Sequence, residues 1–354
     1  MTMSWTRHAL RMGKKERLIA TVPVLDFEPI ARIPFADDEA WRDAAHAEDT
    51  RQVVEDFDRA MRRFGFVQIT SHGVSRSCLS SLRRHADNFF EQEHEEKMRL
   101  NLSEHYGAAG GGFTPIGRES VGRTSDASNA HHEADPVENF VFANRGFEPN
   151  VPDMTGDFSL AAQKYWSEAE ALCTRLMRTS ALALGLQFDF FDDCYRDPSC
   201  SLRLANYRAP KPTDAGKIRY GAHTDYQGFT ILNQTQEGLE VFVEDDDGEE
   251  WVPVPPCQRG GFVVNAGDLI PIWTAGRWKS ALHRVMFPKN FDTAIEPSGE
   301  ENSSTQISRL SCVFFTGPHI DTMVSPVPTC RGQERYVAIR AGDHLQQKLD
   351  ASNV

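Results

Sequence analysis

The sequence predicts a mainly β protein with flanking helices, built on a jelly-roll core of two sheets with helices packed outside one of them. Two observations favour this fold class. Between residues 202 and 315 the chain consists of short β-rich runs separated by Gly, Pro and Asp, which is typical of a double-sheet roll. Before residue 190, apolar residues recur at helical spacing in several segments.

The first part of the chain alternates between strand and helix patterns. Residues 21–26 are predicted to form a short strand, and the apolar spacing in 49–63 predicts an amphipathic helix that leads into a strand at 64–69. The stretch 107–112 is rich in glycine. We expect it to be a flexible joint and not a phosphate-binding loop, because no strand precedes it and no Gly-Lys-Ser/Thr follows it.

Further segments repeat the helical spacing. Gly185 is well placed to end the longest of them. A polar helix is expected at 342–349, close to the end of the chain. The remaining predicted helices are 77–90, 93–99 and 159–184.

These elements suggest four consecutive parts. We expect a flexible N-terminal tail, a mixed helical region, the jelly-roll core and a C-terminal helix, at 1–20, 21–190, 191–330 and 331–354 respectively. Inside the core, the segment 289–305 is rich in Ser, Asn, Glu, Pro and Gly, a composition that predicts a polar hairpin insertion. Because this segment joins two strands of the predicted site, it could also act as a lid.

Length, charge and cysteine usage limit the kind of protein. A chain of 354 residues with 40% hydrophobic residues can bury a large core. The net charge of -13 argues against a nucleic-acid partner, because binding to phosphates needs a basic surface. We expect no membrane partner, since no apolar run is long enough to span a bilayer. The seven cysteines are an odd number and contain no Cys-x-x-Cys pair, so we expect reduced thiols and a cytoplasmic protein. We also expect a monomer.

The pattern His223-Thr224-Asp225, followed further on by His283, is the strongest candidate for a metal site. Both parts lie in strand-like runs, and residues i and i+2 of a strand share a face. We therefore expect His223 and Asp225 to reach one metal, with His283 joining from a neighbouring strand. The same pattern at 85–87 falls in a predicted helix and that at 319–321 in a predicted loop, so we interpret these two as structural.

The ligand types leave two kinds of metal chemistry open. Two imidazoles and one carboxylate leave three adjacent positions free on Fe(II), but with a water they also suit a zinc hydrolase. Downstream, Arg309 and Ser311 are predicted to share a face of another strand. A guanidinium and a hydroxyl in that arrangement can hold a carboxylate, which favours iron chemistry with an acidic cosubstrate.

With these motifs, the chain resembles the isopenicillin N synthase-like branch of the 2-oxoglutarate/Fe(II)-dependent oxygenases. The resemblance covers most of the chain, and its specificity lies in the order of individually weak motifs. The shared segments are Val22-Pro-Val-Leu-Asp26, 64–74, Phe89-Phe90, Glu95-Glu-Lys97, Asn206-Tyr207, His223-Thr-Asp225, Gly238-Leu-Glu-Val241, Val264-Asn-Ala-Gly-Asp268, 276–285 and Arg309-Leu-Ser311.

The resemblance implies a double-stranded β-helix core and roles for individual residues. It implies that His223, Asp225 and His283 bind Fe(II), and that Arg309 and Ser311 hold the C5 carboxylate of 2-oxoglutarate. Tyr207 is similar to a family tyrosine near that carboxylate, although Arg208 replaces the usual following proline. The family also places its Arg-x-Ser closer behind the second histidine than this chain does.

The implied reaction uses O2 and 2-oxoglutarate to oxidise a C–H bond of a small molecule, by hydroxylation, desaturation or ring closure, and releases succinate and CO2. Two alternatives stay open: a 2-oxoglutarate-independent oxidase resembling isopenicillin N synthase, and a non-catalytic binding module or zinc hydrolase. Eight residues are candidates for shaping the substrate cavity: Phe113, Arg118, Arg123, Phe140, Arg219, Phe229, Trp273 and Phe315.

Overall fold

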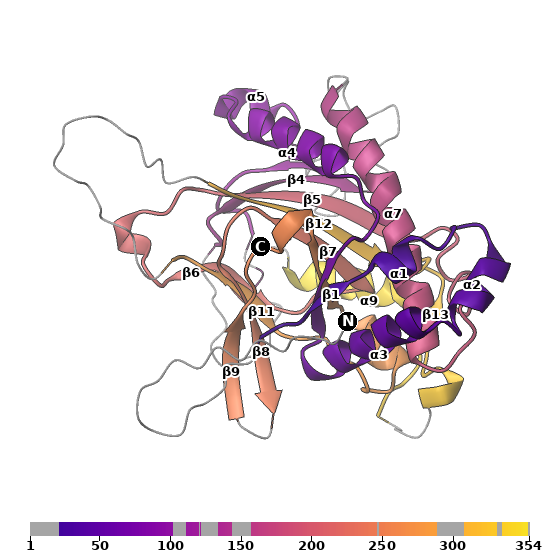
Figure 1. The fold of residues 1–354 in the computed structure, drawn as a ribbon. Helices are drawn as coiled ribbons and strands as arrows, with labels where there is room; N and C mark the ends of the chain where they lie inside the picture. Colours follow the sequence, from indigo (N-terminus) through magenta and orange to yellow (C-terminus); the bar gives the residue numbers. More distant parts are fainter. Residues whose placement is uncertain are drawn as a thin grey trace, which may run out of the picture.

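Two β-sheets form the centre of the molecule (Figure 1). The computed structural model describes residues 21–101, 111–119, 121, 134–143, 157–245, 248–288, 308–330 and 335–352. The eight-stranded sheet has the order β1 (Val24–Asp26), β2 (Phe66–Thr70), β10 (Phe262–Ala266), β7 (Phe229–Gln234), β12 (Arg309–Gly317), β5 (Ser199–Tyr207), β4 (Val137–Ala143) and β3 (Gly112–Thr114). The four-stranded sheet has the order β6 (Ile218–His223), β11 (His283–Met286), β8 (Leu239–Asp245) and β9 (Gly248–Pro253).

Helices cover one face of the large sheet, and the small sheet lies on its other side (Figure 1). The packed helices are α3 (Glu48–Arg63), α4 (Arg76–Phe90) and α7 (Asp157–Ala183), whose contacts reach β2, β7 and β12. The shorter elements are α1 (Glu28–Ala31), α2 (Asp38–Ala44), α5 (His94–Met98), α8 (Leu269–Trp273), α9 (Ala341–Ser352), and the strand pair β13 (Met323–Val324) and β14 (Ile339–Arg340). None of the described helices combines the length and apolar composition needed to cross a membrane.

Strand β12 shows how the two faces of the large sheet differ. Leu310, Cys312 and Phe314 are buried in the core shared with the helices, and the Phe314 ring meets the Trp166 ring of α7 at 5.0 Å. Because side chains alternate along a strand, the residues between them point to the opposite face, toward the small sheet. A second apolar cluster lies in that space and lines the cavity there. The large sheet therefore separates a helix-facing core from a cavity.

Most helices predicted from apolar spacing are confirmed. The ends of α3, α4, α5 and α7 lie within two residues of the predicted ones, and Gly185 has a φ of +71°, the left-handed conformation that suits the end of a helix. The strands β1 to β4 come from the N-terminal half, yet they belong to the same sheet as the core strands. The short helices α1, α2 and α8 have no counterpart in the prediction, because four to seven residues carry too little periodicity.

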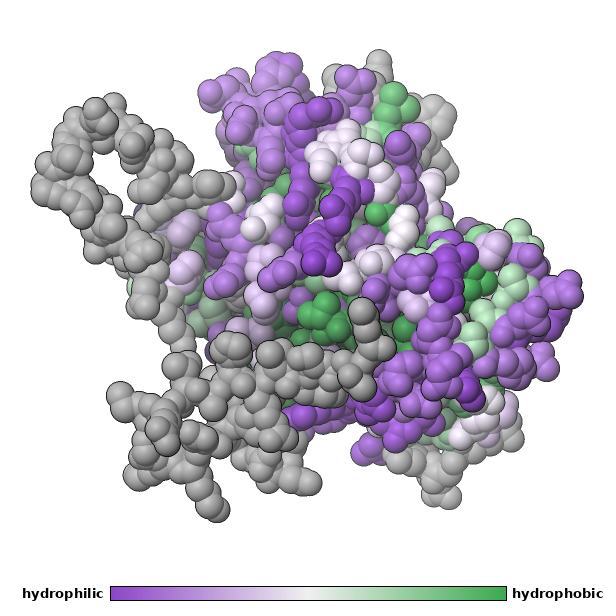
Figure 2. All heavy atoms as spheres, viewed as in Figure 1, coloured by the Kyte–Doolittle hydropathy of each residue, from purple (hydrophilic) through white to green (hydrophobic). Residues whose placement is uncertain are grey.

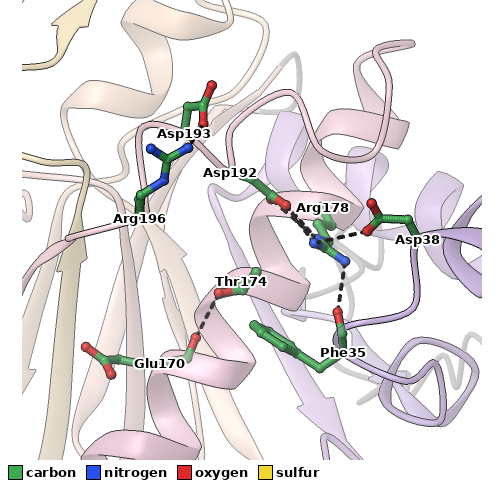
Figure 3. A network of polar contacts seen from close by, with 8 residues as sticks. All are labelled: Phe35, Asp38, Glu170, Thr174, Arg178, Asp192, Asp193 and Arg196. Carbon is green, nitrogen blue, oxygen red and sulfur yellow. Dashed lines mark hydrogen bonds and ion pairs between the residues drawn. The ribbon is translucent and has the colours of Figure 1, made fainter.

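Arg178 of α7 connects the start and the end of the helical region (Figure 3). Its Nε and Nη2 donate to the Asp192 carboxylate, at 2.6 Å for the Nη2 bond, while Nη1 donates to the Phe35 carbonyl at 3.2 Å. The guanidinium also lies 5.1 Å from the centre of the Trp41 ring. The side chain is only 9% exposed, so these contacts compensate for the burial of its charge.

Asp268 fixes the C-terminal helix α9 to the loop before β7. Its Oδ2 lies 2.9 Å from Nζ of Lys348 and 3.5 Å from Nε2 of His344, and its backbone N donates to the carbonyl of Asp225 at 2.8 Å. Burial alone would raise the pKa of Asp268, but the contacts with His344 and Lys348 hold that pKa at about 2. The carboxylate is therefore charged at neutral pH and joins α9 to the loop that carries Asp225.

We expect Arg178→Ala to lower the free energy of unfolding by about 2 to 4 kcal/mol, because it leaves Asp192 without its buried partner. Arg178→Lys should lose less, since it keeps the charge but not the fork. Chemical unfolding measures both effects. Arg196→Ala is the matched control, because its ion pair with Asp193 is exposed (Figure 3) and should contribute nothing measurable. A loss in Arg178→Ala no larger than in this control would contradict the assigned role.

Asp268→Asn should lower the free energy of unfolding by about 1 to 3 kcal/mol, because an amide cannot pair with both Lys348 and His344. Amide hydrogen exchange should increase in α9 and in the loop before β7. Asp343→Asn serves as control, since Asp343 lies on the same helix with a side chain that is 71% exposed. Equal exchange in the two variants would show that Asp268 does not hold the helix.

Candidate metal centre

Three buried side chains that could hold one metal ion meet between the two sheets. The ligand atoms of His223, Asp225 and His283 all lie within 4.8 Å of one another. Nε2 of each histidine lies 3.7 Å from Oδ1 of Asp225. The histidines are brought together because His223 of β6 and His283 of β11 are directly opposite partners in an antiparallel pair. The predicted position of His283 on a neighbouring strand is confirmed.

Asp225 reaches this site in a different way from the one predicted. His223 is the last residue of β6 and Asp225 lies in the loop before β7, so the expectation that they share the face of one strand was wrong. The large sheet holds the Asp225 side chain instead. Thr230 Oγ1 of β7 and Asn265 Nδ2 of β10 each donate to Oδ2 at 2.6 Å. The other oxygen, Oδ1, is left to face the histidines.

Both histidines are held so that Nε2 points into the site. Nδ1 of His223 lies 2.9 Å from the Gly221 carbonyl, and Nδ1 of His283 lies 3.0 Å from the Ala281 carbonyl. A carbonyl accepts only, so each Nδ1 carries the proton and each Nε2 keeps a lone pair. Burial, together with the adjacent His283, lowers the pKa of His223 well below its usual range. The imidazole is therefore neutral, as a metal ligand must be.

Asp135 fixes the strand that carries His223. Its carboxylate accepts hydrogen bonds from the backbone N of Gly221 and of Val121, both at 2.9 Å. The Gly221 carbonyl in turn accepts from His223, so the backbone of one residue links Asp135 to the imidazole. Burial raises the pKa of Asp135 to about 6, partly offset by these two N–H donors. The sequence offered no signal for this contact, because it depends on the fold.

Arg309 and Ser311 lie on one face of β12, as predicted, and line the same cavity as the metal site. Nη2 of Arg309 donates to Oε1 of Gln234 at 2.5 Å, and its guanidinium lies 4.9 Å from the centre of the Tyr207 ring. Nη1 of Arg309 and Oγ of Ser311 have no hydrogen-bond partner among the described residues, although both are buried. Buried polar groups of this kind require a partner, so these atoms mark a place for a ligand.

The cavity joins the metal site to these polar atoms. Apart from residues already named, Arg203 and Tyr220 are its polar side chains. Its lining consists of Phe66, Arg203, Ala205, Tyr207, Tyr220, His223, Asp225, Thr230, Leu232, Leu239, Asn265, His283, Val285, Arg309, Ser311, Val313 and Phe315. An aromatic and aliphatic wall with a few convergent polar groups is typical of a small-molecule site.

The structure places one of the eight predicted cavity residues, Phe315, in this lining. Phe113 and Phe140 face the helices instead, because they are cross-strand partners and pair through β4 with Leu204, a core residue. Phe229 and Trp273 also pack in the helix-facing core. Three remain: Arg118 is exposed, Arg219 is buried beside the Tyr207 ring, and Arg123 lies outside the described residues.

The insertion predicted at 289–305 and the N-terminal tail at 1–20 also lie outside the described residues. Sequence reasoning assigned no function to Thr230, Asn265 and Arg203. For Arg203 a signal existed, since it lies two and four residues before Ala205 and Tyr207 and therefore shares their face of β5.

Comparisons with known proteins agree with this geometry. The sequence-family model described as 2OG-Fe(II) oxygenase superfamily matches residues 199–318. A second family model, described as non-haem dioxygenase in morphine synthesis N-terminal, matches residues 22–147. The chain is 32% identical over 270 residues to the 2-oxoglutarate-dependent dioxygenase traH of Penicillium crustosum, which covers 72% of this chain and 79% of the relative. It is 29% identical over 343 residues to the homoarginine-6-hydroxylase 2-ODD-233 of Oryza sativa subsp. japonica, covering 93% and 96%.

Solved structures show the same fold. A full-length Neurospora crassa protein in complex with alpha-KG has a TM-score of 0.74 and 23% identity, covering 93% of this chain and 96% of that one. The rice dioxygenase for auxin oxidation has a TM-score of 0.67 and 20% identity, covering 93% and 95%. The predicted double-stranded β-helix core with flanking helices is confirmed.

Proposed function

Because the chain belongs to the 2OG-Fe(II) oxygenase superfamily, we propose that His223, Asp225 and His283 are the iron ligands of this 2-oxoglutarate-dependent dioxygenase. The observation that carries the proposal is the convergence of three buried ligand atoms within 4.8 Å. Two neutral imidazoles and one carboxylate are the donor set that Fe(II) takes while keeping positions open for a cosubstrate and O2. The zinc alternative loses its support, because the family uses iron.

The contacts around the ligands fit an iron site. Thr230 and Asn265 donate hydrogen bonds to one oxygen of Asp225 and leave the other directed toward the two Nε2 atoms. The carbonyl contacts at Nδ1 fix the ring planes of both histidines. Partners of this kind orient ligands and tune their basicity, and losing one commonly weakens metal binding about 10- to 100-fold.

Arg309, Ser311 and Tyr207 are proposed to hold 2-oxoglutarate through its C5 carboxylate. The support is the pair of buried donors, Nη1 of Arg309 and Oγ of Ser311, that have no partner among the described residues. A carboxylate placed there satisfies both with charge-assisted hydrogen bonds. Gln234 holds the other side of the guanidinium, so Arg309 is oriented before the cosubstrate arrives.

Bound iron and 2-oxoglutarate supply an oxidant for an unactivated C–H bond, and succinate and CO2 are released. The protein itself positions the substrate and keeps bulk water away from the reacting atoms. Residues His223, Asp225 and His283 are each less than a tenth exposed, so bulk water has little access to the reacting atoms. Rigid strands hold the polar groups, which limits how the substrate can approach.

The substrate is a small molecule, and we propose that it is a specialised metabolite that is hydroxylated, desaturated or cyclised. The support is the apolar wall formed by residues such as Phe66, Leu239 and Val285, together with the similarity to a fungal enzyme named as a 2-oxoglutarate-dependent dioxygenase. The cavity side chains favour a compact and mostly apolar substrate over a polymer.

We propose that the enzyme works as a monomer in a reducing compartment such as the cytoplasm, without a nucleic-acid partner. The face in Figure 2 is mostly hydrophilic, and its hydrophobic groups form small separate patches. All seven cysteines are free, which fits a reducing environment, and the net charge is -13.

Asp225→Ala should abolish succinate formation from 2-oxoglutarate and weaken Fe(II) binding, with little change in circular dichroism, because it removes the ligand that faces both histidines. Anaerobic addition of Fe(II) and 2-oxoglutarate should give a visible charge-transfer band in the unaltered enzyme and none in the variant.

The control for this experiment is Asp321→Ala. Asp321 belongs to a second His-x-Asp pattern with His319, but these side chains are 63% and 41% exposed. It should keep both the band and the turnover. Normal succinate formation by Asp225→Ala would remove the iron-site assignment.

Arg309→Lys should raise the KM for 2-oxoglutarate at least about tenfold and leave Fe(II) affinity unchanged, because it keeps a charge but loses the donor aimed at the C5 carboxylate. Initial rates at varied 2-oxoglutarate, together with anaerobic Fe(II) titration, separate the two effects. An unchanged KM would assign the carboxylate to another residue, whereas a parallel loss of iron would indicate general damage to the site.

A further inference from the structure

Arg203 is a cation of the cavity lining that has no role in the proposed iron and 2-oxoglutarate sites. Arg203 of β5 lines the cavity on the same face as Ala205 and Tyr207. Along that face Tyr207 is the cross-strand partner of Arg309, whereas Arg203 is the partner of Val313. Two residues of a strand span about 6.8 Å, so Arg203 lies about 13 to 14 Å along β5 from the Arg309 end.

Glu119 fixes the Arg203 side chain from outside the cavity. Nη2 of Arg203 donates to Oε2 of Glu119 at 2.6 Å, and the second carboxylate oxygen accepts from Asn139 at 2.9 Å. Glu119 does not line the cavity. No hydrogen bond is formed by Nε or Nη1 of Arg203 within the described part of the chain, and neither is among its fully buried atoms without a partner. The Arg203 side chain lines the cavity and is 15% exposed.

Arg203 lies close to the proposed iron site. Its guanidinium lies 5.3 Å from the centre of the Tyr220 ring, and the Tyr220 ring lies 5.1 Å from the His223 ring. The guanidinium carbon is thus at most about 10 Å from the centre of the His223 ring. Around it the wall of the cavity is apolar: Phe66, Leu232, Leu239, Val285, Val313 and Phe315.

We propose that Arg203 binds a carboxylate of the substrate, so that the enzyme oxidises a small, largely apolar carboxylic acid at a carbon a few bonds from its acid group. A guanidinium that lines an apolar cavity can recognise a carboxylate through charge-assisted hydrogen bonds. Glu119 sets the direction of the Arg203 guanidinium. The inference rests on the proposed function, since it takes the iron and 2-oxoglutarate sites as given.

The competing explanation is structural. If the Arg203–Glu119 pair only joins β5 to the segment after β3, a change at Arg203 weakens the binding of every substrate alike. If Arg203 recognises a carboxylate, the change affects acids and spares neutral molecules of the same shape. An acid and its primary amide have almost the same volume, so a comparison of the two isolates the effect of charge.

The test uses the full chain loaded with Mn(II) in place of iron and with 2-oxoglutarate. The probes are hexanoic, decanoic, phenylacetic and phenylbutyric acids, each beside its primary amide. Proton relaxation caused by Mn(II) reports binding close to the metal. Mn(II) and 2-oxoglutarate binding are measured first, without a probe. Failure at that stage counts against the proposed function, whereas failure only with the probes counts against the role of Arg203.

We expect the unaltered enzyme to bind at least one acid more tightly than its amide. Arg203→Met, which keeps length without charge, should weaken that acid about 10- to 100-fold and change the amide less than about threefold. Arg203→Lys should restore part of the preference. Glu119→Gln should keep the preference for the acid, since the charge of Arg203 remains.

Two results would overturn the proposal. One is that no acid in the panel binds the unaltered enzyme better than its amide. The other is that Arg203→Met weakens acid and amide equally while Mn(II) and 2-oxoglutarate still bind, which is the outcome of a structural role. If Arg203→Met does not fold, Arg203→Gln carries the same comparison, because it also removes the charge: it must weaken the acid more than its amide.

Discussion

The carboxylate of Asp225 is the point at which the two sheets and the metal centre are joined. Thr230 and Asn265 of the large sheet donate to one oxygen, and the other oxygen faces His223 and His283 of the small sheet. A carboxylate that is 6% exposed is poorly solvated, so these hydrogen bonds offset much of the cost of its burial. They also leave Oδ1 directed at the two Nε2 atoms. The contacts that make the buried charge tolerable therefore create the position for a metal ion.

Alternation along the strands keeps this site apart from the rest of the core. On β12, Cys312 and Phe314 pack against the helices, while Ser311 and Val313 line the cavity. Because side chains alternate along a strand, each strand of the cavity has one face that packs in the core and one face that lines the binding site. The helix-facing core can therefore supply most of the buried apolar area without constraining the side chains in the cavity. Changes on the two faces should accordingly have different effects, on unfolding free energy in one case and on ligand affinity in the other.

The sequence predicted the iron-binding candidates better than it predicted the cavity wall. His283 was foreseeable because its strand-like run suggested a neighbour of the first histidine, and β11 does pair with β6. The route to Asp225 was not foreseeable, since the chain leaves the strand at His223 and only tertiary contacts turn the carboxylate back. Phe140 was expected in the cavity, but which face of a strand meets the helices depends on packing, and its partner Leu204 faces the core. Arg203 could have been placed on the Tyr207 face of its strand, because it lies four residues before Tyr207. Its partner Glu119 could not have been predicted, because it is distant in the sequence.

Buried arginines make the region around the cavity suitable for acidic ligands, although the net charge of the protein is -13. Arg219 and Arg309 flank the Tyr207 ring, with guanidinium carbons 5.3 and 4.9 Å from its centre, and neither forms an ion pair with a carboxylate in the described part of the chain. Burial, and then the proximity of Arg309, lowers the pKa of Arg219 to about 10, so Arg219 stays charged at neutral pH. A guanidinium such as that of Arg309 keeps its charge in proteins. Two buried like charges oppose folding of the empty enzyme. A dianionic cosubstrate reduces that repulsion, so its binding should stabilise the fold as well as prepare the reaction, because a ligand that binds only the native state shifts the unfolding equilibrium toward it.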